Sequence, residues 1–158
     1  MLFRSVVVVP LDYDSLGAIE TFFGAASLIV VDDRCCMVQL ALRSTKFYAH
    51  ESCGKCTPCR VGTRWMVQIL ESIENGTATL ADLELLDNVG DNILGKVLCA
   101  LGEFAVYPVA SYLHKWRDEF VAHIEHEGCP FEGTSSLEGI VAPSDQHSHT
   151  PAGQEAMV

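Results

Sequence analysis

The stretch Cys53-Gly54-Lys55-Cys56-Thr57-Pro58-Cys59 places three cysteines at steps of three residues. This spacing puts three thiol groups on one short loop. Iron–sulfur clusters are held by cysteine thiolates, and tight runs of this kind supply several of them together. Zinc sites more often use two separate C-x2-C pairs, and this sequence has no second pair. The loop therefore favours an iron–sulfur cluster over zinc.

A [4Fe–4S] cluster needs four thiolates, so one more cysteine must come from another part of the chain. Spacing offers two candidates, Cys99 and Cys129. Cys99 lies among apolar residues just before Gly102, and Cys129 is followed by Pro130, as in ferredoxin motifs. The residue pattern alone leaves both candidates open.

The residues around the loop suit an anionic cofactor. Gly54 allows the backbone to bend tightly, because it has no Cβ atom. Lys55 and Arg60 bring positive charge next to the three sulfurs. Backbone N–H groups at the start of a helix near Arg60 would likewise stabilise negative charge on the sulfurs.

The other cysteines and histidines are interpreted as structural. Cys35 and Cys36 are adjacent, and adjacent cysteines do not easily share one cluster. His123 and His126 precede Cys129 at steps of three residues, a spacing that a second metal site would also use. We favour the simpler interpretation, in which these residues form the polar side of the last helix and a free thiol.

Composition excludes several classes of function. The 158 residues carry a formal net charge of −11 and no block of Lys or Arg, which argues against nucleic-acid binding. The apolar run at residues 6–9 is too short for a signal peptide or a membrane span, so we expect no direct membrane insertion. Seven cysteines, an odd number, indicate a reducing compartment rather than a disulfide framework.

The predicted fold class is α+β, with a partial β-grasp-like segment followed by an antiparallel helical bundle that holds the cluster. Residues 1–46 form the β-rich segment, with strands at 5–9 and 27–31. Residues 36–42 fit either a strand or a helix, and residues 16–23 fit a short helix.

Residues 47–131 form the helical domain, since apolar residues recur there at steps of three and four. One helix ends at Asn75-Gly76, the next begins with Thr79 and Asp82 as a cap, and Pro108 ends or kinks a later segment. A last apolar stripe runs over residues 109–124. Residues 132–158 contain few large apolar side chains and are predicted to be a disordered tail.

The segment Glu51–Arg60 resembles the C-terminal iron–sulfur region of the flavin-carrying, NADH-binding F subunit of respiratory complex I (NADH:quinone oxidoreductase). The similarity returns at Cys99-Ala100-Leu101-Gly102, at Tyr107-Pro108-Val109 and at Cys129-Pro130-Phe131. Residues 10–16 and 29–32 resemble the end of the small β-grasp (SLBB-like) domain that precedes this region.

The resemblance implies a ligand set and a function. Cys53, Cys56, Cys59 and Cys99 would hold one [4Fe–4S] cluster, which favours Cys99 over Cys129 as the fourth ligand. The cluster would accept electrons from reduced FMN and pass them to a partner iron–sulfur subunit in the peripheral arm of the complex, on the cytoplasmic or matrix side.

In this family, FMN and NAD bind in a glycine-rich domain that lies upstream of the iron–sulfur region. The chain is then either a fragment of a longer oxidoreductase or a separate electron-transfer module. We favour the fragment, and we expect this chain to be inactive alone. Two alternatives remain. The parent could be the diaphorase subunit of an NAD-linked hydrogenase or formate dehydrogenase, or the cysteines could hold zinc in an interaction module without redox function.

Overall fold

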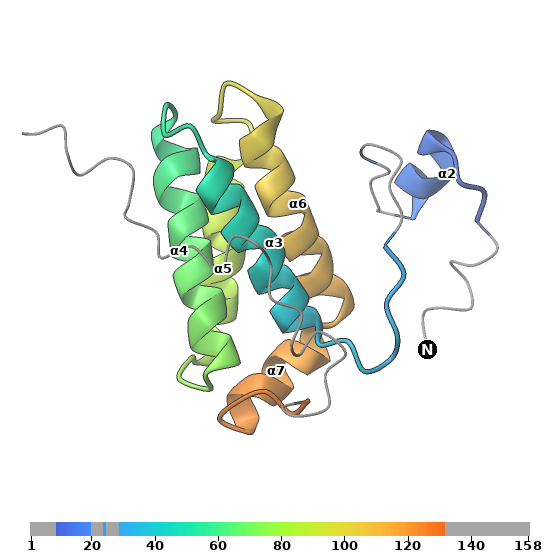
Figure 1. Ribbon diagram of the computed structural model, residues 1–158, viewed down its shortest axis with the longest axis vertical. Coiled ribbons are helices and arrows are strands. Elements are labelled where there is room, and N and C mark those ends of the chain that lie inside the picture. The colour runs from blue at the N-terminus through green and yellow to red at the C-terminus, as the bar shows by residue number, and fades with distance from the viewer. Residues whose placement is uncertain (1–8, 20–23, 25–28, 132–158) are drawn as a thin grey trace, which may run out of the picture.

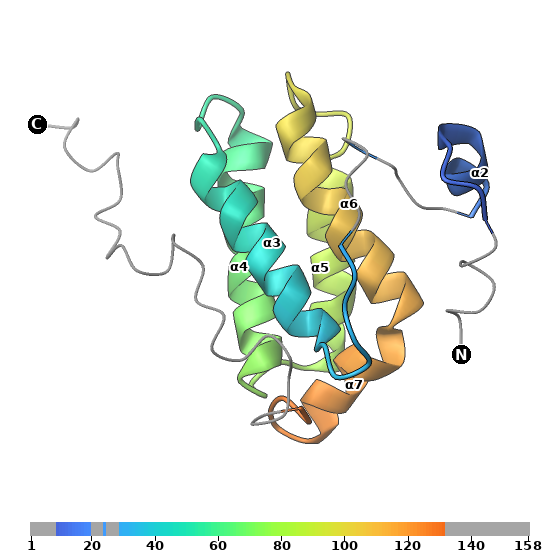
Figure 2. The same cartoon turned by 45° about the vertical axis from the view of Figure 1, so that its right-hand side comes forward.

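The computed structural model describes residues 9–19, 24 and 29–131, and the structural statements below concern these residues. Four helices form an antiparallel bundle (Figure 1): α3 (Met37–Glu51), α4 (Thr57–Glu74), α5 (Leu80–Ile93) and α6 (Ala100–Lys115). A shorter helix, α7 (Arg117–Glu125), lies across one end of the bundle. The short helix α2 (Tyr13–Ala18) lies apart from it in Figures 1 and 2.

The predicted α+β class with a β-grasp-like segment is wrong for this part of the chain. No strand occurs in residues 9–19, 24 and 29–131. Residues 29–31 form no ladder, because a short β-branched run needs a neighbouring strand for its backbone hydrogen bonds. The other residues of the two predicted strands, 5–8 and 27–28, lie outside the described residues, as does the predicted tail at 132–158.

Residues 36–42, which fitted a strand or a helix, belong to the start of α3. The deciding feature is a helical repeat that continues past residue 42: Val38, Ala41, Leu42 and Thr45 are all buried on one face. The domain boundary predicted between residues 46 and 47 lies inside this helix, which packs against α4 and α6. Of the predicted short helix at residues 16–23, residues 16–18 belong to the end of α2, and residues 20–23 lie outside the described residues.

The predicted end of α4 and the predicted start of α5 are confirmed. Helix α4 ends at Glu74, followed by Asn75 as C-cap and by Gly76 with φ +67°. The side chain of Asp82 accepts hydrogen bonds from Thr79 N at 2.7 Å and from Thr79 Oγ1 at 2.8 Å. These bonds satisfy a backbone N–H that the start of α5 would otherwise leave unpaired.

The predictions for the last two helices are partly wrong. Pro108 does not end a helix but lies inside α6, where Val106 and Val109 are buried on either side of it. Packing of this face offsets the backbone hydrogen bond that a proline cannot donate. The last apolar stripe is not one helix either, since the chain turns at Trp116 (φ −124°, ψ 33°) between α6 and α7.

One core runs between the helices. Its largest fully buried side chains come from α4 to α7, and include Met66, Leu70, Ile73, Leu83, Leu86, Ile93, Leu113 and Phe120. Among the described residues, no helix combines the length and apolar character needed to span a bilayer. The short connections between successive helices hold the ends of neighbouring helices together, which determines where the cysteines lie.

The cap of α5 provides a first test. Replacing Asp82 by alanine should lower the free energy of unfolding by about 1 kcal/mol, because the amide of Thr79 loses its acceptor. Urea denaturation monitored by circular dichroism measures this change. Glu84→Ala is the matched control, since it removes the same charge from an exposed position of α5, and it should change stability by less than about 0.5 kcal/mol. Equal losses in both variants would contradict a capping role for Asp82.

Candidate metal centre

Two loops meet at one end of the bundle. Residues 52–56 connect α3 to α4, and residues 94–99 connect α5 to α6. Figures 1 and 2 both show these connections at the end opposite α7. The backbone N–H of Leu98 donates to Cys56 Sγ at 3.4 Å, so the two loops are in direct contact. The fold therefore brings Cys99, the residue after Leu98, close to the cysteine loop.

The cysteine loop has the conformation that its sequence suggests. Gly54 has φ +77°, a left-handed conformation that glycine adopts without strain. The guanidinium of Arg60 donates to the carbonyl of Gly54, so that its charge lies over the loop. Cys56 is the N-cap of α4 and Cys59 lies in its first turn. Cys53 is exposed, Cys56 is half-buried and Cys59 is buried.

Cys99 occupies a position in the second loop that is equivalent to that of Cys56 in the first. It is the N-cap of α6 and is exposed. The N-termini of α4 and α6 carry the positive ends of their helix dipoles, and both lie beside the sulfurs. A cluster held by four thiolates is anionic, so these helix ends and Arg60 suit its charge. The donor set fits an iron–sulfur cluster: three thiols on one loop, and a fourth on the loop that touches it.

Cys129, the other candidate for the fourth ligand, lies elsewhere. Its Sγ atom is 3.8 Å from Cys36 Sγ, at the start of α3. His123, which was predicted to lie on the polar side of the last helix, is fully buried, with Nε2 3.3 Å from Cys36 Sγ. That interpretation of His123 is wrong. The residue pattern does not reveal that Cys36 lies beside His123 and Cys129, because Cys36 comes from a distant part of the chain and a different helix.

Burial changes the chemistry of these two thiols. Removal from water raises the pKa of the Cys36 thiol well above its ordinary value, and the nearby carboxylate of Glu74 raises it further. The pKa of Cys129 is raised mainly by the same loss of hydration. Both thiols therefore stay protonated at neutral pH when no cation is bound.

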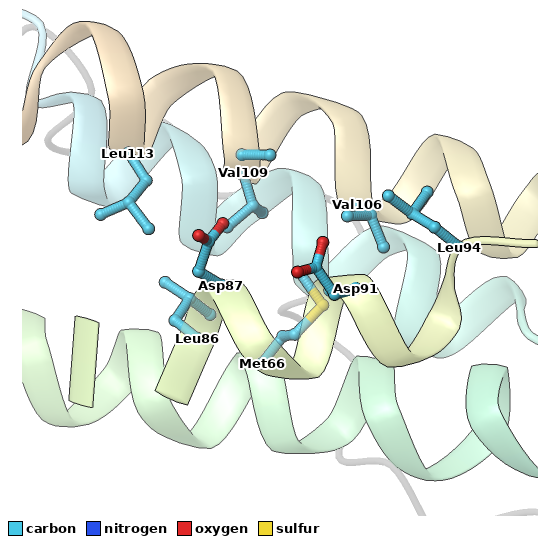
Figure 3. A pocket seen from close by; sticks show the side chains of 10 residues that line it. Met66, Leu86, Asp87, Asp91, Leu94, Val106, Val109 and Leu113 are labelled. Atoms are coloured by element: carbon cyan, nitrogen blue, oxygen red, sulfur yellow. The ribbon is translucent and has the colours of Figure 1, made fainter. Parts of the chain in front are cut away.

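A shallow pocket opens between α5 and α6 (Figure 3). Its lining is mainly apolar: Val106, Val109 and Leu113 of α6 face Leu86 and Met66, and the carboxylates of Asp87 and Asp91 lie between the two rows. Its volume is about 30 Å³, whereas small-molecule sites typically measure roughly 300–1,000 Å³. This pocket is too small for a nicotinamide or flavin ring.

Comparison with known proteins agrees with the cysteine geometry. Residues 39–123 match the family described as the NADH-ubiquinone oxidoreductase-F iron-sulfur binding region. The chain is 48% identical over 128 residues to the NADH-quinone oxidoreductase F subunit of Streptomyces coelicolor, covering 81% of the chain and 28% of that protein. It is 46% identical over 129 residues to the corresponding F subunit of Mycobacterium tuberculosis, covering 82% and 29%.

Hydrogenase subunits are also similar. The HndC subunit of the NADP-reducing hydrogenase of Solidesulfovibrio fructosivorans is 37% identical over 129 residues, covering 82% of the chain and 26% of that protein. A crystal structure of NAD+-reducing [NiFe]-hydrogenase in the H2-reduced state aligns with a TM-score of 0.56 and 36% identity, over 64% of this chain and 17% of that one.

The chain thus spans less than a third of the length of these relatives. The matched family covers α4, α5 and α6 and most of α3 and α7, and it includes both contacting loops. The chain belongs to the family of NADH-ubiquinone oxidoreductase-F iron–sulfur binding regions.

Proposed function

We propose that Cys53, Cys56, Cys59 and Cys99 hold one [4Fe–4S] cluster. The observation that carries the proposal is the hydrogen bond from Leu98 N to Cys56 Sγ, which ties the two cysteine-bearing loops together. The only other candidate that spacing offered, Cys129, contacts Cys36 instead. Membership of an iron–sulfur family supports the same choice of cofactor.

The proposed role is electron relay. When bound, such a cluster exchanges single electrons, here between a flavin that NADH reduces in the whole protein and a partner iron–sulfur subunit. The residues of this chain hold and surround the cofactor. Cys53 and Cys99 are exposed and Leu98 is 84% exposed, so this end of the bundle is open to an electron donor and an acceptor. At the inner side, the buried Cys59 and the core of the bundle exclude water.

The surrounding groups set the charge of the site. Arg60 donates to the Gly54 carbonyl and keeps a positive charge next to the loop. The N–H of Leu98 donates to a cluster sulfur ligand, and such hydrogen bonds favour the reduced form, which carries the more negative charge. We therefore infer that Arg60 and Leu98 raise the reduction potential of the site.

The parent that we propose is an NADH:quinone oxidoreductase, with FMN and NAD bound by other parts of the protein and this region in the peripheral arm of a membrane-bound complex. The chain is 48% and 46% identical to the F subunits of S. coelicolor and M. tuberculosis and 37% identical to HndC, which supports this choice. The similarity to NAD+-reducing hydrogenase keeps a diaphorase as the second candidate. NADH oxidation would in either case need the parts of the protein that bind FMN and NADH.

Anaerobic purification of the chain tests the cofactor. We expect about four irons and four sulfides per chain and a brown colour that bleaches on addition of dithionite. The control is Cys56→Ser, which removes a loop ligand and should lose the iron. A colourless product without iron, or zinc that disappears in Cys56→Ser, would overturn the proposal and support a zinc-stabilised module.

A further inference from the structure

A second group of metal-binding side chains lies at the other end of the bundle, close to α7. It consists of Cys36, the N-cap of α3; Glu74, the last residue of α4; His123 in α7; and Cys129 just after α7. One ligand atom from each residue lies within 4.8 Å of all the others. Cys36 and His123 are fully buried. None of these residues belongs to the proposed iron–sulfur site.

The distances agree with tetrahedral coordination. With bonds of about 2.3 Å to sulfur and about 2.0 Å to nitrogen or oxygen, the ligand atoms of a tetrahedral zinc site lie roughly 3.3–3.8 Å apart. The two sulfurs of Cys36 and Cys129 are 3.8 Å apart. His123 Nε2 is 3.3 Å from Cys36 Sγ and 3.6 Å from Glu74 Oε2. These three distances lie in the tetrahedral range, and all pairs of the four ligand atoms lie within 4.8 Å, so a small adjustment of the side chains would let all four reach one Zn²⁺ ion.

The histidine is held in the form that binds a metal. His123 Nδ1 lies 2.8 Å from the backbone carbonyl oxygen of Glu119, which can only accept a hydrogen bond. Nδ1 is therefore the nitrogen that donates a proton here, and Nε2, which faces Cys36 and Glu74, is the nitrogen that can bind a metal. Metal-binding histidines usually have such a hydrogen bond on their second nitrogen, because it fixes the tautomer and the ring orientation.

Charge also favours a cation here. Two thiolates and a carboxylate within 4.8 Å of one another in a largely buried site would repel one another. A divalent cation offsets this repulsion. Cys36 Sγ also accepts the N–H of Gln39 at 3.3 Å, a bond that stabilises a thiolate at the start of α3.

We infer that Cys36, Glu74, His123 and Cys129 form a structural zinc site. Binding of Zn²⁺ displaces the thiol protons of Cys36 and Cys129, which pass to solvent, and forms two Zn–S bonds, one Zn–N bond and one Zn–O bond. The site joins the start of α3, the end of α4 and the segment after α7. Helix α7 has only nine residues, so the ion would hold it against the bundle.

Metal analysis of the full chain, purified anaerobically with its iron–sulfur site loaded, tests this inference. We expect one zinc per chain in addition to the iron, and loss of that zinc in Cys36→Ser and Cys129→Ser with the iron content unchanged. The matched controls are Cys35→Ser, which alters the neighbouring buried cysteine outside the group, and His126→Ala, which removes an exposed histidine. Both controls should keep the zinc.

A conservative variant distinguishes a loss of zinc binding from misfolding of the chain. Glu74→Gln preserves shape but removes the charge, and it should weaken zinc binding by roughly tenfold or more in competition with a chromophoric chelator. Adding the chelator should lower the unfolding temperature of the unmodified chain and leave that of Cys129→Ser unchanged.

Two results would overturn the inference. One is a wild-type chain that binds no zinc even after incubation with Zn²⁺, which would leave a hydrogen-bonded group of protonated side chains. The other is zinc that is kept in Cys129→Ser and lost in Cys56→Ser, which would place the ion on the cysteine loop. Iron content reports separately on the proposed electron relay, so failure of one proposal is distinguishable from failure of the other.

Discussion

Cys99→Ser should yield a chain with less than about a tenth of the wild-type iron and sulfide, with no dithionite-sensitive absorbance. A serine hydroxyl stays protonated at neutral pH and is a poor ligand for iron, whereas a thiolate binds it strongly. The position matters as much as the atom. Cys99 is the N-cap of α6 and directly follows Leu98, whose N–H reaches Cys56 Sγ. Among the described residues, the two contacting loops contain only Cys53 and Cys56 besides Cys99, and Cys59 follows in the first turn of α4.

Cys129→Ser is the matched control for this prediction. It makes the same atomic change in the other candidate for the fourth ligand, but at the opposite end of the bundle, where Cys129 contacts Cys36. Its iron, sulfide and absorbance should equal those of the wild type. The measurement is quantification of iron and sulfide under anaerobic conditions, with circular dichroism to compare helix content. Loss of iron in Cys129→Ser and its retention in Cys99→Ser would show that the ligand assignment is wrong.

The sequence was most informative where structure depends on near neighbours. The cap of Asp82 on Thr79 and the stop at Gly76 follow from residues within one turn, and both were predicted correctly. The described part of the N-terminal region was not predicted correctly. Short β-branched runs carry little information by themselves, because a strand exists only when another strand pairs with it. The helical repeat of α3 also begins in a segment that fits either a strand or a helix.

The same division applies to the two proposed metal sites. Three cysteines of the iron–sulfur loop are close in sequence, so their common role could be recognised. Cys36, Glu74 and His123 are far apart in the chain, and only the packing of α3, α4 and α7 brings them together. The step from His123 to Cys129 was the one signal of this second group, and without the partners from α3 and α4 it indicated only a polar helix face.

Gly76→Ala should lower the free energy of unfolding of the chain by roughly 2–5 kcal/mol. Gly76 has φ +67°, a conformation in which a Cβ atom costs about 1–2 kcal/mol. A Cβ atom there would also overlap the backbone of Glu127 and Gly128, which cannot move aside as a flexible side chain could. Such overpacking adds about 1–3 kcal/mol. The turn after α4 therefore touches the segment after α7 so closely that only glycine fits.

Gly95→Ala separates the two contributions to this loss. Gly95 has φ +68°, almost the same as Gly76, but nothing lies within 4 Å of the position that its Cβ would take. Urea denaturation should give a loss of about 1–2 kcal/mol for Gly95→Ala, the cost of the backbone conformation alone. Equal losses in the two variants would contradict the close contact between the turn and residues 127–128. If the contact is real, displacing Glu127 and Gly128 also moves Cys129 away from Cys36, and Gly76→Ala should release the zinc while Gly95→Ala keeps it.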